Sequence, residues 1–425
     1  MVSALKKKIY FFVAYYFRIF AKIQLLRWRP RVIVVTGSSG KTTLLHLIES
    51  QLKEKARYSY HANSTFGLPF DILDLNQEMT SRVRWLWLFA AAPFRAFKKP
   101  YTEKIYVAEV DCDRPGEGKF LGSLLRPEVT LWLNSGSTHT VNFDHVVKQR
   151  KFSSVEAAIA YEFGYLAQYA GKLVIANGDN PLMLDQLERA KAVKKIVTRR
   201  QLKKYTVSEK GTQFIIDGIT YATPFLLPED SFYAIAMANA LVSYLGLAFD
   251  KSLSNFTLPP GRSSAFKGFK NTTLIDSSYN ATPDGVAAIL NMFSVYVAKN
   301  KWLVLGDMIE LGKEEQEEHE KLVPQITAIN AKKIVFVGPR ISKYTYGLFR
   351  QSGFDAAPED VVAFEYPADG LKYIQENIKG GETILFKGAR FLEGVVEHLL
   401  ADKNDVDELC RREKVWQERR KKWGL

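Results

Sequence analysis

Residues 32–43 read Val-Ile-Val-Val-Thr-Gly-Ser-Ser-Gly-Lys-Thr-Thr, and this stretch decides the fold. The run Val32–Val35 is short and β-branched, as is typical of a buried parallel strand, and a helix is expected from about Thr42 to Lys53. Glycines in the turn between them let the backbone point its N–H groups at an anion, and the start of the helix adds positive charge. The stretch therefore predicts a phosphate-binding loop between a strand and a helix.

The residue types in this loop suit a nucleotide. A lysine at position 41 supplies a mobile positive charge for the β- and γ-phosphates, and the hydroxyl that follows it can ligate Mg²⁺. A full Walker motif would carry glycine at position 35, where this chain has Val35, so the loop is the shortened variant G-x-x-G-K-T. A glycine turn that served only packing would leave the lysine unexplained. We expect the nucleotide to be bound by Gly37, Ser38, Ser39, Gly40, Lys41, Thr42 and Thr43.

The composition fits a protein of two or three domains and argues against a nucleic-acid partner. The chain has 425 residues, and its charged fraction of 25% is ordinary for globular proteins. Of the formal net charge of +13, eight positive charges lie within residues 1–31, which contain no acid, so the rest of the chain is close to balanced. The two cysteines, Cys112 and Cys410, exclude a disulfide framework and a four-cysteine zinc ribbon, and they favour a reducing, cytosolic location.

The basic N-terminal segment carries an apolar run that is short for a membrane span. Residues 9–17 read Ile-Tyr-Phe-Phe-Val-Ala-Tyr-Tyr-Phe and are followed by Arg18 and Lys22, whereas a spanning helix needs about 20 apolar residues. No small-residue cleavage site of a signal peptide follows. The mix of aromatics and cations indicates a short amphipathic helix over residues 1–30, which either lies in the membrane interface or packs on the body by its aromatic face. A second apolar stretch, residues 85–89, leaves the same two alternatives open.

Beyond the phosphate loop, strand and helix patterns alternate along the chain. This alternation predicts α/β units built on mostly parallel sheets. The pattern breaks at residues 257–261, Thr-Leu-Pro-Pro-Gly, where we place a linker between two α/β domains, and residues 401–425 are expected to form a charged surface helix. Strands are predicted at residues 105–110, 129–133, 173–176, 273–275, 302–305, 333–337 and 383–386, and helices at residues 155–169, 232–245 and 285–297.

Several further stretches follow the loop in a fixed order. In the first domain they are residues 63–69 (Asn-Ser-Thr-Phe-Gly-Leu-Pro), Glu109 at a strand end, residues 114–117 (Arg-Pro-Gly-Glu), Asn134 five residues before His139, and residues 177–180 (Asn-Gly-Asp-Asn). In the second they are Gly261-Arg262, residues 276–283 (Asp-Ser-Ser-Tyr-Asn-Ala-Thr-Pro), residues 305–312 (Leu-Gly-Asp-Met-Ile-Glu-Leu-Gly), His319, and residues 387–390 (Lys-Gly-Ala-Arg). This ordered set resembles the Mur ligase family of ATP-dependent amide ligases, and most closely the branch that adds D-alanyl-D-alanine to the muramoyl tripeptide.

The resemblance implies a fold and a reaction. The fold would be a central P-loop-type ATPase domain over residues 31–256, with a mostly parallel sheet, followed by a Rossmann-like α/β domain over residues 257–400. The reaction would pass the γ-phosphate of ATP to a substrate carboxylate, after which an amine attacks the acyl phosphate. The expected partners are ATP, a carboxylate acceptor and an amino acid or dipeptide amine, in the synthesis of cell-wall precursors. The expected location is the cytoplasm, with the inner face of the cell membrane as the more specific alternative.

The resemblance also assigns roles to individual residues. Lys41 is expected to clamp the phosphates and to form the catalytic set together with Glu109 and His139. Mg²⁺ is expected to be held by Thr42, Glu109 and His139. A lone histidine after a strand is more often a satisfied polar residue, but its spacing from the preceding asparagine supports the metal role.

Further nucleotide contacts are expected from residues outside the loop. The resemblance places Asn63 near the nucleotide and gives Arg262 and Asp276 contacts with ribose or phosphate. For Asp276, a carboxylate that only closes a turn at a strand end is the alternative. Lys387 and Arg390 follow a strand and are either basic substrate contacts or part of an ordinary surface loop.

Three departures from the family's pattern change what we expect. The family usually carries a carbamylated lysine where this chain has Ala160, so that anionic role is unfilled, is taken by a residue such as Glu162, or the second metal is held differently. Residues 230–234 (Asp-Ser-Phe-Tyr-Ala) replace the helix start that contacts adenine, so base recognition is expected to differ. The phosphate loop begins at residue 36 of this chain. In the peptidoglycan-adding members of the family, a domain that binds the UDP-sugar precursor precedes the loop. We therefore expect an acceptor that is gripped in another way, and a membrane-linked acceptor fits the basic aromatic helix.

Other functions stay open beside the leading one. A folylpolyglutamate-synthase-like glutamate ligase also lacks that preceding domain, but its usual signatures fit this sequence less well. A lipid II amidating ligase subunit would carry a zinc ribbon, which is absent. From a different class, the departures at Ala160 and residues 230–234 leave room for a nucleotide-binding scaffold that has lost turnover.

Overall fold

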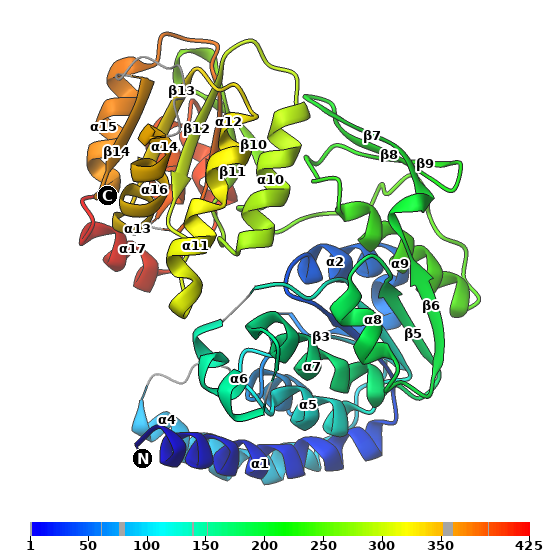
Figure 1. Cartoon of the computed structure of the whole chain (residues 1–425). Helices are drawn as coiled ribbons and strands as arrows, with labels where there is room; N and C mark the ends of the chain where they lie inside the picture. Colours follow the sequence, from blue (N-terminus) through cyan, green and yellow to red (C-terminus); the bar gives the residue numbers. More distant parts are fainter. Residues whose placement is uncertain are drawn as a thin grey trace. The chain divides into compact units, whose positions relative to one another are not determined.

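The computed structural model describes residues 2–60, 62–75, 81–137, 140–150, 152–351, 360–389 and 391–425. By its internal contacts the chain forms two compact units (Figure 1). The first unit contains Met1–Gly136, Asn142–Arg199 and Tyr233–Asp250, and the second contains Ser137–Val141, Arg200–Phe232 and Lys251–Leu425. Both units are built from helices on a mostly parallel sheet, which confirms the predicted α/β class.

The first unit is organised by a six-stranded sheet in which all neighbouring strands are parallel. Its order is β2-β3-β1-β4-β5-β6, so the chain starts in the middle, builds one side and then crosses to the other side of β1. In open α/β sheets, ligands bind at the carboxyl ends of the strands where the order reverses in this way. The strands are β1 (Arg31–Thr36), β2 (Ala56–Tyr58), β3 (Ile105–Val110), β4 (Val129–Trp132), β5 (Leu173–Asn177) and β6 (Val193–Val197).

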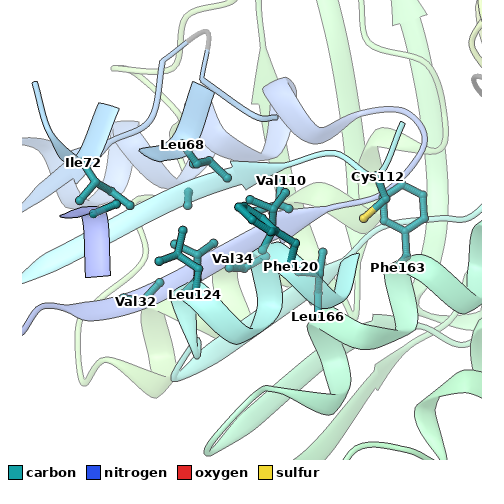
Figure 2. Packing of buried hydrophobic residues seen from close by; sticks show 14 of the residues in the cluster. Val32, Val34, Leu68, Ile72, Val110, Cys112, Phe120, Leu124, Phe163 and Leu166 are labelled. Atoms are coloured by element: carbon teal, nitrogen blue, oxygen red, sulfur yellow. The ribbon is translucent and has the colours of Figure 1, made fainter. Parts of the chain in front are cut away.

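Helices cover this sheet and close its core. Figure 2 shows Val34 and Val110 of the strands packed against Phe120 and Leu166 of two helices, and each such buried side chain contributes about 1.5–3 kcal/mol. The described helices of the unit are α1 (Val2–Trp28), α2 (Lys41–Leu52), α3 (Gly67–Ile72), α4 (Arg82–Ala96), α5 (Glu117–Leu125), α6 (Asp144–Arg150), α7 (Val155–Gln168), α8 (Pro181–Leu187) and α9 (Ser231–Tyr244), the last beginning in the second unit.

The N-terminal helix predicted over residues 1–30 is present as α1, Val2–Trp28. The segment Ile9–Trp28 is apolar and long enough to cross a membrane, judged by length and composition only. One stripe of the helix, which includes Phe17 and Trp28, is buried in the core of the first unit. Packing on the body therefore accounts for part of its aromatic content, and α4, which contains the second apolar stretch, lies beside it (Figure 1).

The second unit contains a six-stranded sheet in the order β10-β11-β15-β12-β13-β14, antiparallel only between β10 and β11. Two apolar clusters cover its two faces. The strands are β10 (Ser264–Gly268), β11 (Thr272–Ser277), β12 (Lys301–Gly306), β13 (Lys333–Val337), β14 (Val361–Phe364) and β15 (Thr383–Lys387). The described α-helices after residue 250 are α10 (Pro283–Val295), α11 (Glu315–Glu320), α12 (Leu322–Thr327), α13 (Pro339–Ile341), α14 (Gly347–Gln351), α15 (Pro367–Asn377), α16 (Leu392–Leu399) and α17 (Lys414–Lys421).

Two features of the second unit differ from the sequence-based expectations. A three-stranded antiparallel sheet, with strands β7 (Leu202–Ser208), β8 (Gly211–Ile216) and β9 (Ile219–Thr223), was not predicted, and its residues group with the second unit. The C-terminal helix is shorter than residues 401–425, because Arg411 has a left-handed φ of 59° and the α-helix begins only after it.

We predict that Gly118→Ala destabilises the first unit. Gly118 lies on α5, where an added Cβ would collide with the backbone carbonyl of Glu162 on α7, so the two helices would have to separate. We expect a loss of about 1–3 kcal/mol, measured as a lower denaturant midpoint by circular dichroism. The control is Gly171→Ala in the same unit, whose Cβ would meet no described atom closer than 3.7 Å. Equal midpoints for the two variants would contradict this account of the helix contact.

Candidate active site

The phosphate loop lies in the turn from β1 to α2, at the point where the strand order of the first sheet reverses. Gly37 has φ 139° and Gly40 has φ 77°, a region in which side chains are strained. At Gly37 an added Cβ would also lie 2.9 Å from the side-chain oxygen of Asn134. The backbone of the loop therefore depends on glycine at both positions.

Asn134, just after β4, anchors this loop. Its Oδ1 accepts a hydrogen bond from the Ser39 N–H at 3.0 Å, and its Nδ2 donates to Ser39 Oγ at 2.7 Å. Next to it, Ser38 Oγ accepts from the Gly136 N–H at 2.7 Å and donates to the Gly136 carbonyl at 3.0 Å. The only signal at Asn134 in the sequence was its spacing from His139, and its role as an anchor was not predicted.

Lys41 is buried at the start of α2 and is held by an acid that the sequence analysis did not single out. Its Nζ forms an ion pair with Asp111 Oδ2 at 2.8 Å and donates to the Gly37 carbonyl at 2.6 Å. Burial lowers the pKa of Lys41, but the carboxylates of Asp111 and Glu109 outweigh burial and leave its pKa above the ordinary value. Lys41 therefore stays charged, which its predicted role as a phosphate clamp requires.

The other first-unit candidates lie near the same strand ends. Glu109 is half-buried on β3 and pairs in register with Val35 of β1, and its charge acts on Lys41. The carbonyl of Asn63 accepts a hydrogen bond from the Asp111 N–H at 2.9 Å, which places residue 63 beside the lysine's partner. The structure thus brings together Asn63, Glu109 and the loop residues Gly37, Ser38, Ser39, Gly40, Lys41, Thr42 and Thr43.

The residues present fit a magnesium ion that is held partly by its substrate. Mg²⁺ is usually bound through one or two carboxylates together with substrate phosphates. Glu109 offers a carboxylate and Thr42 a hydroxyl, while His139, the third predicted ligand, lies outside the described residues. Among the described residues, no group of three or more His, Cys, Asp or Glu side chains could hold a metal. Glu109 and Thr42 would hold the ion together with the phosphates of the substrate.

An uncharged residue, Ala160, stands where the family carries its modified lysine. Ala160 is fully buried in α7. Two residues along, the buried Glu162 accepts a hydrogen bond from the Gly118 N–H at 3.1 Å in the first turn of α5. The Glu162 carboxylate therefore accepts a hydrogen bond from the first turn of α5. That Glu162 takes over the anionic role of the modified lysine remains a prediction.

In the second unit, Asp276 and Arg262 lie in one polar cluster at the end of β11. Asp276 is fully buried, and its Oδ1 accepts a hydrogen bond from the Ser278 N–H at 2.9 Å. Burial raises the pKa of Asp276, although the bonds to Ser278 pull it down. The guanidinium of Arg262 lies over the ring of Tyr279, 4.6 Å from its centroid.

Lys387, at the end of β15, completes this cluster. Its Nζ donates to the Asn280 carbonyl at 2.9 Å, and the side chain is buried. Burial and the nearby Arg262 lower the pKa of Lys387 to about 7, and Asp276 offsets only part of that shift. Lys387 is therefore no ordinary surface lysine, while Arg390, its predicted companion, lies outside the described residues.

We predict that Asn134→Ala loosens the phosphate loop and weakens nucleotide binding. The change removes both side-chain bonds to Ser39 but leaves Lys41 in place, so we expect about a tenfold or larger rise in the Kd for a nonhydrolysable ATP analogue. Calorimetric titration measures it. Asn377→Ala is the control, because that amide donates to the Tyr373 carbonyl within its own helix, α15. Unchanged affinity in Asn134→Ala would show that the loop holds its shape without this anchor.

We predict that Lys387 makes stability depend on pH. Its folded pKa is near 7, below that of an unfolded lysine, so the folded state releases a proton at neutral pH and gains stability as the pH rises. From about pH 6 to about pH 9, wild type should gain on the order of 2 kcal/mol relative to Lys387→Met. Thermal melts at each pH measure this difference, and the exposed Lys267→Met is the control. A difference that stays constant with pH would contradict the low pKa.

Comparison with known proteins identifies the family. The sequence matches the Mur ligase middle domain over residues 35–224 and the Mur ligase glutamate ligase domain over residues 261–390. The UDP-N-acetylmuramoyl-tripeptide–D-alanyl-D-alanine ligase of Bacillus subtilis is 27% identical over 395 residues, which cover 89% of this chain and 78% of that protein. The Escherichia coli protein of the same name is 25% identical over 374 residues, covering 85% of this chain and 74% of the relative.

Solved structures agree in fold. The MurF ligase of Thermotoga maritima in complex with ADP has a TM-score of 0.71 at 21% identity, covering 93% of this chain and 84% of that one. The folylpolyglutamate synthase of Mycobacterium tuberculosis has a TM-score of 0.57 at 15% identity, covering 91% and 95%. With two matched domains in order and a phosphate loop between β1 and α2, the chain belongs to the Mur ligase family, whose members are ATP-dependent ligases that form carbon–nitrogen bonds.

Proposed function

We propose that the protein joins the carboxylate of a cell-wall precursor to the amine of an amino acid or dipeptide, at the expense of ATP. The observation that carries this proposal is the buried, charged Lys41, held beside two carboxylates where the strand order reverses. The relatives named above act on a muramoyl tripeptide and D-alanyl-D-alanine, and we propose substrates of these chemical classes for this chain.

The first step activates the acceptor. A carboxylate oxygen attacks the γ-phosphorus of ATP, the bond to the bridging oxygen breaks, and ADP leaves behind an acyl phosphate. Both reacting groups are anions, so catalysis depends on converging positive charge. Lys41 and the N–H groups of the loop supply that charge, and we propose that the phosphates replace Asp111 as the anion that Lys41 contacts.

We propose that the residues predicted from the sequence make the contacts with the metal and the nucleotide. When bound, Mg²⁺ neutralises charge on the phosphates, and Thr42, Glu109 and His139 would hold it. Asn63 is proposed to contact the nucleotide in the first unit. Arg262 and Asp276 are proposed to contact ribose or phosphate from the second unit, where they share a cluster with Lys387.

The second step forms the amide. The amine nitrogen attacks the carbonyl carbon of the acyl phosphate, and the bond from that carbon to the phosphate oxygen breaks. Inorganic phosphate leaves, and the nitrogen loses a proton to water. The overall products are the amide, ADP and phosphate.

We propose further that the acceptor is carried on a lipid at the inner face of the cell membrane. Phe12 and Phe94, on the helices α1 and α4, are exposed by 79% and 80%, and cations flank them in the sequence. Confinement of enzyme and acceptor to one surface would raise their effective concentration. The alternative is a soluble acceptor that carries a nucleotide-sugar group. Comparing turnover of the lipid-linked and the soluble acceptor would distinguish the two.

We predict that Lys41→Ala and Glu109→Ala each reduce acceptor-dependent phosphate release by about 100-fold or more, because each removes a charge at the reacting phosphates. The assay supplies ATP, Mg²⁺ and a panel of muramoyl-peptide acceptors and amines. Lys195→Ala, which removes an exposed lysine from β6, is the control and should retain wild-type turnover.

A different result would support the scaffold instead. If wild type binds the nucleotide but releases no phosphate with any acceptor and amine, the ligase assignment fails. Nucleotide-only hydrolysis that is insensitive to Lys41→Ala would show that the measured activity does not arise at this loop.

A further inference from the structure

Helix α1 is apolar on two opposite sides. Its inner stripe is buried in the core of the first unit and includes Ala14, Phe17, Ala21, Leu25 and Trp28. Its outer stripe recurs at intervals of three, four and seven residues and is exposed, although the Tyr15 ring at its edge also lies 5.1 Å from the ring of the core residue Phe120. A contiguous apolar surface left exposed on a folded protein marks an interaction site. The outer stripe consists of Ile9, Phe12, Tyr15, Ile19 and Leu26, which are exposed by 49–79%.

Helix α4 repeats this arrangement beside it. Leu88, Ala92 and Ala96 are buried in the same core cluster as the inner stripe of α1. The opposite side of α4 and its C-cap residue carries Val83, Leu86, Trp87, Phe94 and Phe97, which are exposed by 42–80%. The two helices lie side by side (Figure 1) and bury their inner stripes in one core, and from this we infer that their outer stripes form one apolar face. We call these ten outer residues the α1–α4 face.

The charge of the chain is concentrated on the same two segments. Residues 1–31 carry eight cations and residues 82–99 carry five, and neither segment contains an acid. Together these thirteen charges equal the whole formal net charge of +13, so the rest of the chain is neutral overall. Lys22 and Lys99 are exposed on these segments. At the C-terminal end of α4, a hollow of about 520 Å³ is lined by Pro93, Phe94, Arg95, Phe97 and Lys98.

Side-chain contacts fix α1 to the body along its length. Trp28 Nε1 donates to the Glu103 carbonyl at 2.6 Å, and Arg27 Nη1 donates to the Ala96 carbonyl at 2.8 Å. Phe17 is fully buried. Insertion of α1 across a bilayer would break these contacts and uncover the core. The helix can therefore reach a membrane only from one side, by its outer stripe.

We propose that the α1–α4 face docks the enzyme on an anionic lipid bilayer, lying in the plane of the interface. Exposed aromatic and aliphatic side chains would enter the headgroup and acyl boundary, while exposed cations such as Lys22 and Lys99 would contact lipid phosphates. Arg31, Arg95 and Lys98 are paired with Glu128 and Asp74 and contribute less. This proposal deepens the proposed function, because it names the surface that would bring the enzyme to a lipid-borne acceptor. Docking itself does not require turnover, so the two can fail separately.

The test is co-sedimentation of the full chain with vesicles of phosphatidylglycerol and phosphatidylcholine, and with vesicles of phosphatidylcholine alone. We expect binding to the anionic vesicles that weakens as salt is added. Phe12→Ser combined with Phe94→Ser should lower the partition coefficient by about tenfold or more. The matched control is Val193→Ser combined with Val297→Ser, which removes apolar side chains exposed by 70% and 82% elsewhere on the chain.

A charge-reversal pair separates the electrostatic contribution. Lys22→Glu combined with Lys99→Glu should weaken binding to anionic vesicles by about 30-fold or more, because each removed cation contributes about 1 kcal/mol and each added acid is repelled by the lipid. Lys195→Glu combined with Lys204→Glu, on exposed positions of β6 and β7, makes the same change of net charge and should bind like wild type. Circular dichroism of all variants checks that the fold is kept.

Three outcomes would overturn the proposal. Wild type that stays in the supernatant with anionic vesicles shows that the face binds no bilayer. Equal losses in the test and control variants show that binding has no dedicated surface. A dimer in analytical ultracentrifugation that Phe12→Ser with Phe94→Ser converts to monomer, without vesicle binding, shows that a second copy covers the face. Vesicle binding without any ligase activity would instead leave the docking intact and refute the proposed function.

Discussion

The buried ammonium group of Lys41 needs an anion at contact distance, and the first unit is arranged around that need. A parallel sheet brings the carboxyl ends of β1 and β3 together, so Asp111 reaches the lysine without any contact that is local in sequence. The same edge carries Asn134, which holds the loop in the conformation that its glycines allow. A triphosphate entering this turn would meet a site whose charge balance is already set for one strong anion.

The second unit uses its strand ends in two distinct ways. Around β11 and β15, Asp276 and Lys387 are both buried. Burial raises the pKa of Asp276 and lowers the pKa of Lys387, and the charge of each residue partly offsets this shift in the other. After β12, polar groups serve structure: His319 Nε2 accepts from the Met308 N–H at 3.1 Å, and Asp307 accepts two backbone N–H groups at the start of α13. Asp307 and His319 therefore brace the backbone, whereas the nucleotide contact of Asp276 is a proposal.

The parts of the fold that the sequence revealed are those with local causes. The strand at residues 105–110 and the turn at Gly37 follow from β-branched runs and glycine spacing. Asp111 reaches Lys41 because β3 lies next to β1 in the sheet, and no local sequence pattern reports which strands are neighbours. The position of an acid directly after a predicted strand was a signal that could have pointed to it. The antiparallel sheet was missed because β7 is rich in exposed lysine and lacks a continuous apolar run. The two alternatives for α1 could not be separated because both of its sides are apolar, and each alternative describes one side.

The inner stripe of α1 also makes the N-terminus part of the folded body. Phe17 and Trp28 complete the core of the first unit, so a truncated enzyme would expose that core and aggregate whether or not a membrane matters. Removal of the helix is thus unsuitable for separating anchorage from folding. Because the inner and outer stripes are separate sets of residues, polar replacements confined to the outer stripe should remove the proposed docking surface and leave the core of the first unit intact.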